Sequence, residues 1–404
     1  TITVFVMKKD IINCFNLAGL ILDRLESSES ICLHVRSPKN IFLCRKCERV
    51  TKTVYDRKVR IVCHGMFGNK KVLLLFKCRR FKCKYCQFVF TEPSPLGISR
   101  KRYDEHFADE AVRHLSTSNF KETGKRYHVS SHTLITMLRE RKQKEELPAG
   151  ELILNVDEHS FSGRDLKITI GEIRNKKLLA VLKDDRQETL RRYFKSMPDE
   201  AKSRVKEACI DMKQSYLTVL NEMLPDAKVV LDRFHVVKEM VRQVEELRKI
   251  MQNNGRIGDR RINRFLLAKN REDLTEDERE RLKLIFERNK KFPALQNAYF
   301  VKEKVRDMYH SKNRKEAERK LDMLILQLEE FEVGKIREMR DTLKRWRPYI
   351  LNFFESRTTN AFIEGCHNKI KLIKRMSYGF RNFDNYVLKI TLAFAPFLFI
   401  NLPH

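Results

Sequence analysis

Long apolar runs are missing from this chain, and so is any segment with the layout of a secretory signal peptide. No stretch of 18 or more residues is continuously apolar, which excludes a membrane-spanning helix. Ten cysteines in 404 residues are too few for a disulfide scaffold. The sequence also lacks internal repeats and low-complexity tracts. We therefore expect a cytoplasmic, globular protein of two to four domains that has no membrane partner.

The chain contains fewer acidic than basic residues. The chain has 54 acidic residues against 83 basic ones, which gives a formal net charge of +29. The excess is uneven, because residues 36–84 contain 16 Lys and Arg but only Glu48 and Asp56 as acids. A positive charge of this size favours a polyanionic partner, and nucleic acid is the first candidate.

Four of the cysteines form two CxxC pairs, Cys44–Cys47 and Cys83–Cys86. Two such pairs can close one tetrahedral Zn²⁺ site, and the ion would be structural because protein thiolates fill all four positions. Two surface turns with free thiols are the alternative, and Cys78 or His64 is a possible substitute ligand. We expect the basic residues near the second pair to contact phosphate, namely Arg79, Arg80 and Lys82.

Residues 107–142 have the layout of a helix-turn-helix. The pattern predicts a helix over Phe120–Tyr127, a turn over 128–130, and a further helix from His132 to about Lys142 with Ser131 as its N-cap. The start of that last helix would reach base edges in a major groove. An ordinary three-helix bundle is the alternative. The residues expected at the groove include Ser131, His132 and Thr133.

Beyond residue 150 the pattern changes to alternating strands and helices, and acids follow several of the strands. Asp157 ends the strand ELILNVD, Asp211 ends EACID and Asp232 ends KVVLD. A fourth acid, Glu364, lies in a helical stretch near the C-terminus. The residues between 238 and about 350 are charged, periodic and poor in Gly and Pro, which predicts an all-helical segment.

The helix that carries Glu364 has two different sides. Its apolar stripe consists of Phe362, Cys366, Ile370 and Ile373. The other side carries Asn360, Glu364, Asn368 and Lys371, and Lys374 and Arg375 follow. An acid flanked by amides and bases suits a metal site beside a phosphate backbone. The DNA contacts expected here are Asn368, Lys371, Lys374 and Arg375.

The order of these elements resembles the ribonuclease-H-like core of DDE transposases and retroviral integrases. The segments VDEHSFSG, IDMKQSYLTVLNEMLPDAKVVLDRFHVVKEM and TTNAFIEGCHNKIKLIKRMSYGFRNFDNYVLKI look like bacterial insertion-sequence transposases of the ISL-three family. CRKC and RRFKCKYCQFVF resemble the zinc finger of that family. The resemblance, over about residues 40–395, implies DNA strand cleavage and strand transfer at the terminal inverted repeats of a mobile element.

The resemblance also implies an α/β multidomain fold, with a mixed-sheet ribonuclease-H-like core interrupted by a helical insertion. We expect six segments: a lead-in helix at 1–30, a zinc finger at 31–92, a helix-turn-helix at 100–147, the first part of the core at 151–238, the helical insertion at 239–350, and the last part of the core at 351–404.

This chemistry needs acids that hold metal ions. Two Mg²⁺ (or Mn²⁺) ions about 4 Å apart activate the attacking oxygen and stabilise the leaving oxygen. Hard cations of this kind prefer carboxylate ligands. Asp157 is expected to bridge the two ions, and two further acids would hold one ion each.

The resemblance implies that the fourth strand lies next to the first and that the fifth lies beyond it. Neighbouring strands are about 4.8 Å apart, so Asp211 would be near Asp157 and Asp232 about twice as far away. We therefore expect Asp157, Asp211 and Glu364 to form the catalytic triad, with Asp232 as the alternative second acid. Asp232 and His235 match a C/D-x-x-H motif of related transposases. His235 would orient a carboxylate or contact DNA, unless it is an ordinary structural histidine.

The sequence therefore favours a transposase that acts on double-stranded DNA, both the element ends and the target. Pairing of two ends implies a homo-oligomer on DNA, in the bacterial cytoplasm. A catalytically inactive DNA-binding protein, such as a decayed transposase or repressor, is the alternative from another class. A metal-dependent nuclease without transposition would share the acids but would not need two DNA-binding modules.

Overall fold

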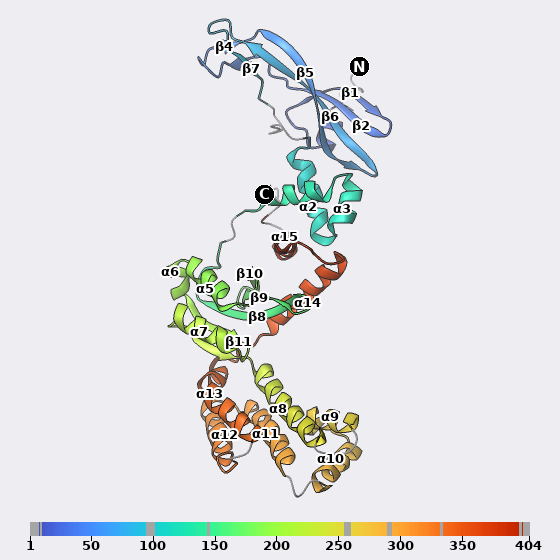
Figure 1. The fold of residues 1–404 in the computed structure, drawn as a ribbon. Helices are drawn as coiled ribbons and strands as arrows, with labels where there is room; N and C mark the ends of the chain where they lie inside the picture. The colour runs from blue at the N-terminus through green and yellow to red at the C-terminus, as the bar shows by residue number, and fades with distance from the viewer. Residues whose placement is uncertain are drawn as a thin grey trace. The chain divides into compact units, whose positions relative to one another are not determined.

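The computed structural model divides into two compact units, residues 1–145 with 371–404, and residues 146–370. It describes residues 8, 10–93, 102–143, 146–253, 260–288, 293–331, 334–395 and 398. Figure 1 shows the order of the elements along the chain. The boundary between the units falls inside helix α14 (Ala361–Met376), which carries Glu364 in its first turn.

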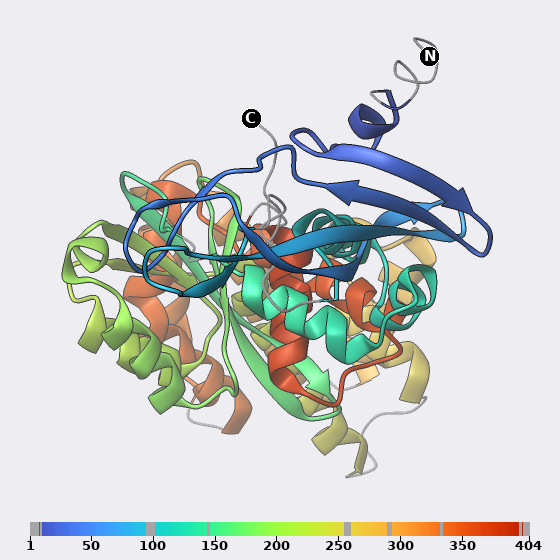
Figure 2. The ribbon, with the colours of Figure 1, turned by 90° about the horizontal axis from the view of Figure 1, so that it is seen from above.

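A five-stranded sheet opens the first unit, and Figure 2 draws it in shades of blue. Its strands follow the order β1-β2-β6-β5, with β7 paired to β6. Along β6 every second residue faces the core, including Val72, Leu74 and Phe76, as the period of a strand requires. The strands are β1 (Ile21–Ser27), β2 (Ser30–Arg36), β5 (Val54–Phe67), β6 (Lys70–Lys82) and β7 (Val89–Thr91), and a separate pair is β3 (Phe42–Leu43) with β4 (Val50–Thr51).

The lead-in helix predicted for residues 1–30 is corrected by the structure. Residues 10–14 are helical, but Ile21–Ser27 is strand β1, and residues 1–7 and 9 lie outside the described part of the chain. Leu22 of β1 pairs with Val35 of β2, and both side chains are buried in the core of the sheet. Pairing with a neighbouring strand outweighs the local helical pattern here.

Three short helices follow in the first unit: α2 (Glu105–Thr117), α3 (Phe120–Tyr127) and α4 (Ser131–Arg141). The N-cap of α4 is Ser130, whose hydroxyl accepts a hydrogen bond from the Thr133 N–H, and not Ser131 as predicted. His128 ends α3 in the left-handed conformation, which turns the chain into α4.

The C-terminal helix α15 (Phe383–Phe394) shares its core with these three helices. Leu388 and Leu392 belong to the same buried cluster as Phe107 of α2 and Leu138 of α4. The ammonium group of Lys389 also donates a hydrogen bond to the carbonyl oxygen of Ser116. The sequence grouped residues 351–404 with the core sheet, but the structure groups residues 371–404 with the first unit.

The second unit is built on a mixed five-stranded sheet of order β10-β9-β8-β11-β12. β9 runs antiparallel to both β8 and β10, whereas β11 is parallel to both β8 and β12. The fourth strand, β11, therefore lies directly beside the first, and the fifth lies beyond it. The elements are β8 (Leu152–Ser162), β9 (Asp165–Glu172), β10 (Lys177–Val181), α5 (Gln187–Ser196), α6 (Asp199–Ser203), β11 (Val205–Ile210), α7 (Gln214–Met223) and β12 (Lys228–Leu231).

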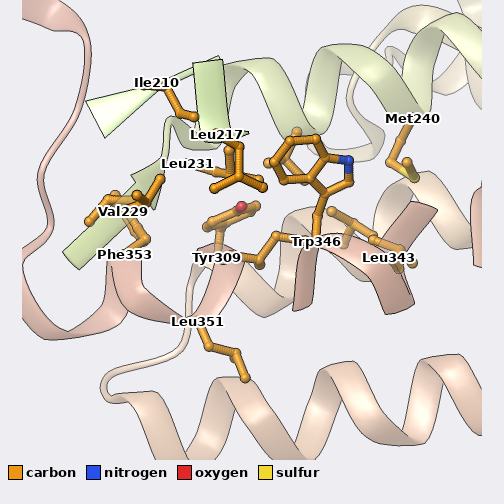
Figure 3. Packing of buried hydrophobic residues seen from close by; sticks show 14 of the residues in the cluster. Ile210, Leu217, Val229, Leu231, Met240, Tyr309, Leu343, Trp346, Leu351 and Phe353 are labelled. Atoms are coloured by element: carbon orange, nitrogen blue, oxygen red, sulfur yellow. The ribbon is translucent and has the colours of Figure 1, made fainter. Parts of the chain in front are cut away.

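A helical segment joins β12 to α14, and its core is continuous with that of the sheet. Figure 3 shows Leu231 of β12 packed among Tyr309, Trp346 and Phe353. The side-chain amide of Asn352 also donates to the carbonyl oxygen of Val229 at 2.8 Å. The helices are α8 (Arg233–Asn253), α9 (Arg260–Ala268), α10 (Glu276–Arg288), α11 (Ala294–Tyr309), α12 (Arg314–Gln327) and α13 (Gly334–Ser356), with a 3₁₀ turn at Arg271–Asp273.

Two boundaries differ from those predicted. β8 does not end at Asp157 but continues to Ser162, because its second half pairs with β9. β12 ends at Leu231, and α8 begins at Arg233 with the Asp232 carbonyl oxygen accepting from the Val236 N–H. His235 therefore lies in the first turn of a helix and not in a strand.

Candidate catalytic site

Three aspartates lie in one row where the parallel pairing of β8, β11 and β12 ends. Val156 of β8 pairs with Ile210 of β11, and Ile210 pairs with Leu231 of β12. The next residue on each strand is an aspartate: Asp157, Asp211 and Asp232. The carboxyl ends of neighbouring parallel strands meet at the same edge of a sheet, and in an open α/β sheet this edge is the usual place for a functional site.

Asp211, the middle member of the row, has a partner for each carboxylate oxygen. His235 Nδ1 lies 2.9 Å from Oδ2, and the side-chain amide of Asn360 donates to Oδ1 at 2.9 Å. Burial lowers the pKa of His235, but the hydrogen bond and the charge of Asp211 outweigh this effect and raise that pKa above its ordinary value. A positively charged His235 would form an ion pair with the Asp211 carboxylate.

Asp232 is the most buried of the three aspartates, with 3% of its surface exposed. Its Oδ1 accepts the backbone N–H of Asn360 at 3.2 Å, which attaches the start of α14 to the end of β12. Burial raises the pKa of Asp232. These contacts give Asp232 a structural partner and little access to solvent, whereas the side chain of Asp211 is 21% exposed.

Asp157 is buried, with 7% of its surface exposed, and lies next to Asp211 in the row. Its Oδ1 accepts the backbone N–H of Glu158 at 2.7 Å, and its Oδ2 lies 3.5 Å from His367 Nδ1. Burial and the negative charge of Asp211 together raise the pKa of Asp157 to about 7. The two carboxylates are thus close enough to repel each other.

Glu364 lies on the side of α14 that faces this row. Asn360, Glu364 and His367 are spaced by four and three residues, so they share one helix face. Asn360, at one end, contacts Asp211 and Asp232, and His367, at the other end, contacts Asp157. The Glu364 residue is exposed, and its carboxylate makes no hydrogen bond or ion pair with any residue that the structure describes.

The sequence did not predict the two residues that connect α14 to the sheet in this way. Asn360 was placed beside Glu364 on the polar side of the helix but was given no contact with the sheet, and it is 1% exposed; His367 was not singled out. The apolar stripe is Ile363, Cys366, Ile370 and Ile373, because Phe362 is only half-buried. Three of the four predicted members are buried, and only Phe362 is replaced, by Ile363. Periodicity does not show which polar residues beside the stripe contact the sheet, so the contact of His367 with Asp157 was not predicted.

The four paired cysteines of the first unit come together. Their sulfur atoms all lie within 4.8 Å of one another, with Cys44 and Cys86 3.5 Å apart and Cys47 and Cys83 3.6 Å apart. The backbone N–H of Cys86 lowers the pKa of Cys83 to about 6. A cluster of four thiols is compatible with a structural zinc site.

The two possible substitute ligands lie elsewhere. Cys78 is buried in the core of the five-stranded sheet with Phe76. His64 pairs with Asp104, and its other ring nitrogen lies 2.6 Å from the Phe15 carbonyl oxygen. Neither side chain is therefore needed to complete the cysteine cluster.

The basic and polar residues expected to contact DNA differ in their exposure and in whether their side chains are already bonded to other residues. Arg79 is held by Glu92 at 2.7 Å and by Asn40, so it supports the sheet around the cysteine cluster. Arg80 pairs with Asp56 at 2.9 Å, and Lys82 lies half-buried 6.0 Å from the centre of the Tyr55 ring. Ser131 and His132 are exposed at the start of α4, and Thr133 is half-buried there. On α14 the exposed members of the predicted set are Asn368, Lys371 and Arg375, while Lys374 is half-buried.

None of the described helices is both long and apolar enough to cross a membrane.

Comparison with known proteins identifies the family of this chain. A transposase of an insertion sequence element from Bordetella parapertussis, IS1001, is 24% identical over 390 residues, which cover 93% of this chain and 95% of that protein. The transposase of IS1557 from Mycobacterium tuberculosis is 26% identical over 220 residues, 48% of this chain and 49% of that one. A family model described as Transposase, for DDE transposases of the ISL3 type, matches residues 154–390, which contain the sheet, the helical segment and α14. The chain therefore belongs to the ISL3 family of insertion-sequence transposases.

Proposed function

We propose that this transposase cleaves and joins DNA strands at the ends of its insertion sequence, with Asp157, Asp211 and Glu364 as the catalytic acids. The observation that carries this proposal is that one face of α14 contacts the row of aspartates. Asn360 and His367 contact the acids of the row, and Glu364 lies between them on the same face. The sheet order β10-β9-β8-β11-β12 supports a ribonuclease-H-like core.

Divalent metal ions fit the chemistry of these residues. Burial and the negative charge of Asp211 raise the pKa of Asp157 to about 7, and a cation bound between the two carboxylates would offset both effects. Carboxylate oxygens are the ligands that Mg²⁺ and Mn²⁺ prefer. A pair of bound ions supplies activation of water or a 3′-hydroxyl and stabilisation of the leaving oxygen.

Under this proposal the acids have different roles, and neighbouring residues orient Asp211. Asp157 and Asp211 would hold the metal ions from the sheet, and Glu364 would complete the site from α14. His235 and Asn360 orient the Asp211 carboxylate, one from each side. Asp232 anchors the first turn of α14 through the Asn360 N–H, so it supports the site without belonging to the triad.

The first unit is proposed to recognise DNA. The cysteine cluster would hold one structural Zn²⁺, and α2, α3 and α4 would act as a helix-turn-helix in which Ser131, His132 and Thr133 reach the major groove. Lys82, Asn368, Lys371, Lys374 and Arg375 would contact the phosphate backbone, and Arg80 would do so if it leaves Asp56. Arg79 is assigned to support of the sheet, because its guanidinium group is already bonded to Glu92.

Cleavage of a DNA that carries the element's ends tests this proposal. The wild type with Mg²⁺ should nick the ends, Asp211→Ala should abolish nicking, and Asp232→Ala should retain a reduced activity. Specific binding of the ends without nicking by the wild type would support the inactive DNA-binding protein instead. Full cleavage by Asp211→Ala would reject the proposed triad.

A further inference from the structure

Asn360 is a fully bonded polar residue at the centre of the site. Its backbone N–H donates to Asp232, its side-chain amide nitrogen donates to Asp211, and its carbonyl oxygen accepts the N–H of Glu364 at 3.0 Å. Its side-chain oxygen accepts from the amide of Asn155, at 2.8 Å. The residue is 1% exposed, and its two side-chain hydrogen bonds, one at each end of the amide, favour one orientation of that amide.

The chemistry of the partners determines which way this amide points. The nitrogen of the Asn360 amide faces Asp211, whose Oδ1 accepts its hydrogen bond. The oxygen then faces Asn155, which donates to it and also to the carbonyl oxygen of Thr359 at 3.1 Å. Asn155 lies on β8 and is itself fully buried. A chain of two amides therefore runs from β8 to the acid of β11.

An ordinary helix cap does not explain this arrangement. An N-cap side chain accepts the N–H of a residue two or three positions later in its own helix. Among the described residues, the side-chain oxygen of Asn360 instead accepts from β8, and its nitrogen donates to the end of β11. Capping of α14 would not require either of these contacts.

We propose that Asn360 is a positioning residue for the metal-binding acids, an inference that rests on the proposed function. Its amide holds the Asp211 carboxylate, and its backbone fixes the start of the helix turn that ends at Glu364. One residue, through its side chain and its backbone, thus links an acid of the sheet to the acid of α14. Groups that support metal ligands in this way affect metal affinity or activity about 10- to 100-fold.

The test is Mn²⁺ binding by the full chain without DNA, measured from the electron paramagnetic resonance signal of free Mn²⁺. Asn360→Ala should weaken Mn²⁺ binding about tenfold while binding of the element's ends stays within about twofold of the wild type. Asn352→Ala is the matched control, since this half-buried asparagine joins α13 to β12 but contacts none of the acids. It should bind Mn²⁺ as the wild type does.

Asn360→Ser separates positioning from helix capping. Serine is a good N-cap and should keep α14 folded, but it is too short to reach Asp211, so Mn²⁺ binding should remain about tenfold weak. Wild-type Mn²⁺ binding by Asn360→Ser, or an equal loss in Asn352→Ala, would overturn the inference. Asp211→Ala distinguishes the two proposals, because wild-type Mn²⁺ binding by that variant would reject the metal site itself.

Discussion

At the residue scale, the row of aspartates shows how neighbours on adjacent strands acquire different roles. Asp157, Asp211 and Asp232 follow paired positions on three parallel strands. Asp211 is the most accessible and is held by two side chains, whereas Asp232 is buried and bonded to the backbone of α14. The catalytic assignment therefore depends on partners and exposure, which the three similar strand ends in the sequence do not reveal.

Metal binding by this site should depend on pH. The pKa of Asp157 is raised to about 7, so its carboxyl group is largely protonated at pH 6 and ionised at pH 8. Because a metal ion displaces that proton, Mn²⁺ should raise the thermal transition temperature of the second unit more at pH 8 than at pH 6. Differential scanning calorimetry with and without Mn²⁺ measures this difference.

Ionisation of Asp157 lowers the stability of the metal-free protein, whereas it favours metal binding. An acid whose pKa is raised by folding favours the folded state while it is protonated, so its contribution is lost as the pH rises from about 4 to about 7. Asp157→Asn should remove both effects. An Mn²⁺-induced shift in Asp157→Asn equal to that of the wild type at pH 8 would contradict the assignment.

At the element scale, the C-terminal helix α15 completes the core of the three-helix module. Leu392 is fully buried in the cluster that contains Phe107 and Leu138. Leu392→Ala should destabilise this module by about 2–5 kcal/mol, as large-to-small changes in cores do. Hydrogen exchange of the α2 and α4 amides should become faster, while exchange in β8 and β11 should not change.

A buried ion pair joins β5 to the start of α2. Asp104 caps α2 by accepting the Phe107 N–H and also pairs with His64, whose second nitrogen faces the Phe15 carbonyl oxygen. Burial lowers the pKa of His64, but the hydrogen bond and charge of Asp104 outweigh this and raise it. A raised histidine pKa gives stability that is present below about 6.5 and is lost as the pH rises through the folded-state pKa.

The first unit should therefore melt at a lower temperature at pH 9 than at pH 6, relative to a His64→Gln variant. Calorimetric scans of both proteins across this range measure the gap between their transition temperatures. The difference between the two transition temperatures should become smaller as the pH rises. A gap that is constant from pH 6 to pH 9 would show that His64 is neutral in the folded protein.

Much of the architecture can be predicted from the sequence, because long periodic segments and strand-end acids leave strong patterns. The strand order around Asp157 and Asp211 follows from the family resemblance. Strand β1 was missed, since ILDRLES fits either a strand or a helix and only its pairing with β2 decides. The roles of Asn360 and His367 could not be predicted, because they depend on the rotation of α14 against a sheet distant in sequence.

At the scale of the whole molecule, the proposed function gives the chain two metal sites of different kinds. The cysteine cluster lies in the first unit, and the acids lie in the second. We expect one zinc ion per chain by elemental analysis. The double variant Cys83→Ser with Cys86→Ser should lose it and bind the element's ends at least about tenfold more weakly, while Mn²⁺ binding at the acids remains. Binding of the ends at wild-type strength by the zinc-free variant would argue against a DNA-recognition role for this module.

The central claim is that Asp211 belongs to the catalytic centre, and that Asp232, which matches the C/D-x-x-H motif, does not. A crystal structure of the full chain bound to its DNA ends with Mn²⁺ tests it most directly, through the anomalous scattering of the metal. Asp157 and Asp211 oxygens should lie about 2.0–2.3 Å from the anomalous peaks, with Glu364 completing the site. A peak coordinated by Asp157 and Asp232, with Asp211 still bonded only to His235 and Asn360, would contradict the account.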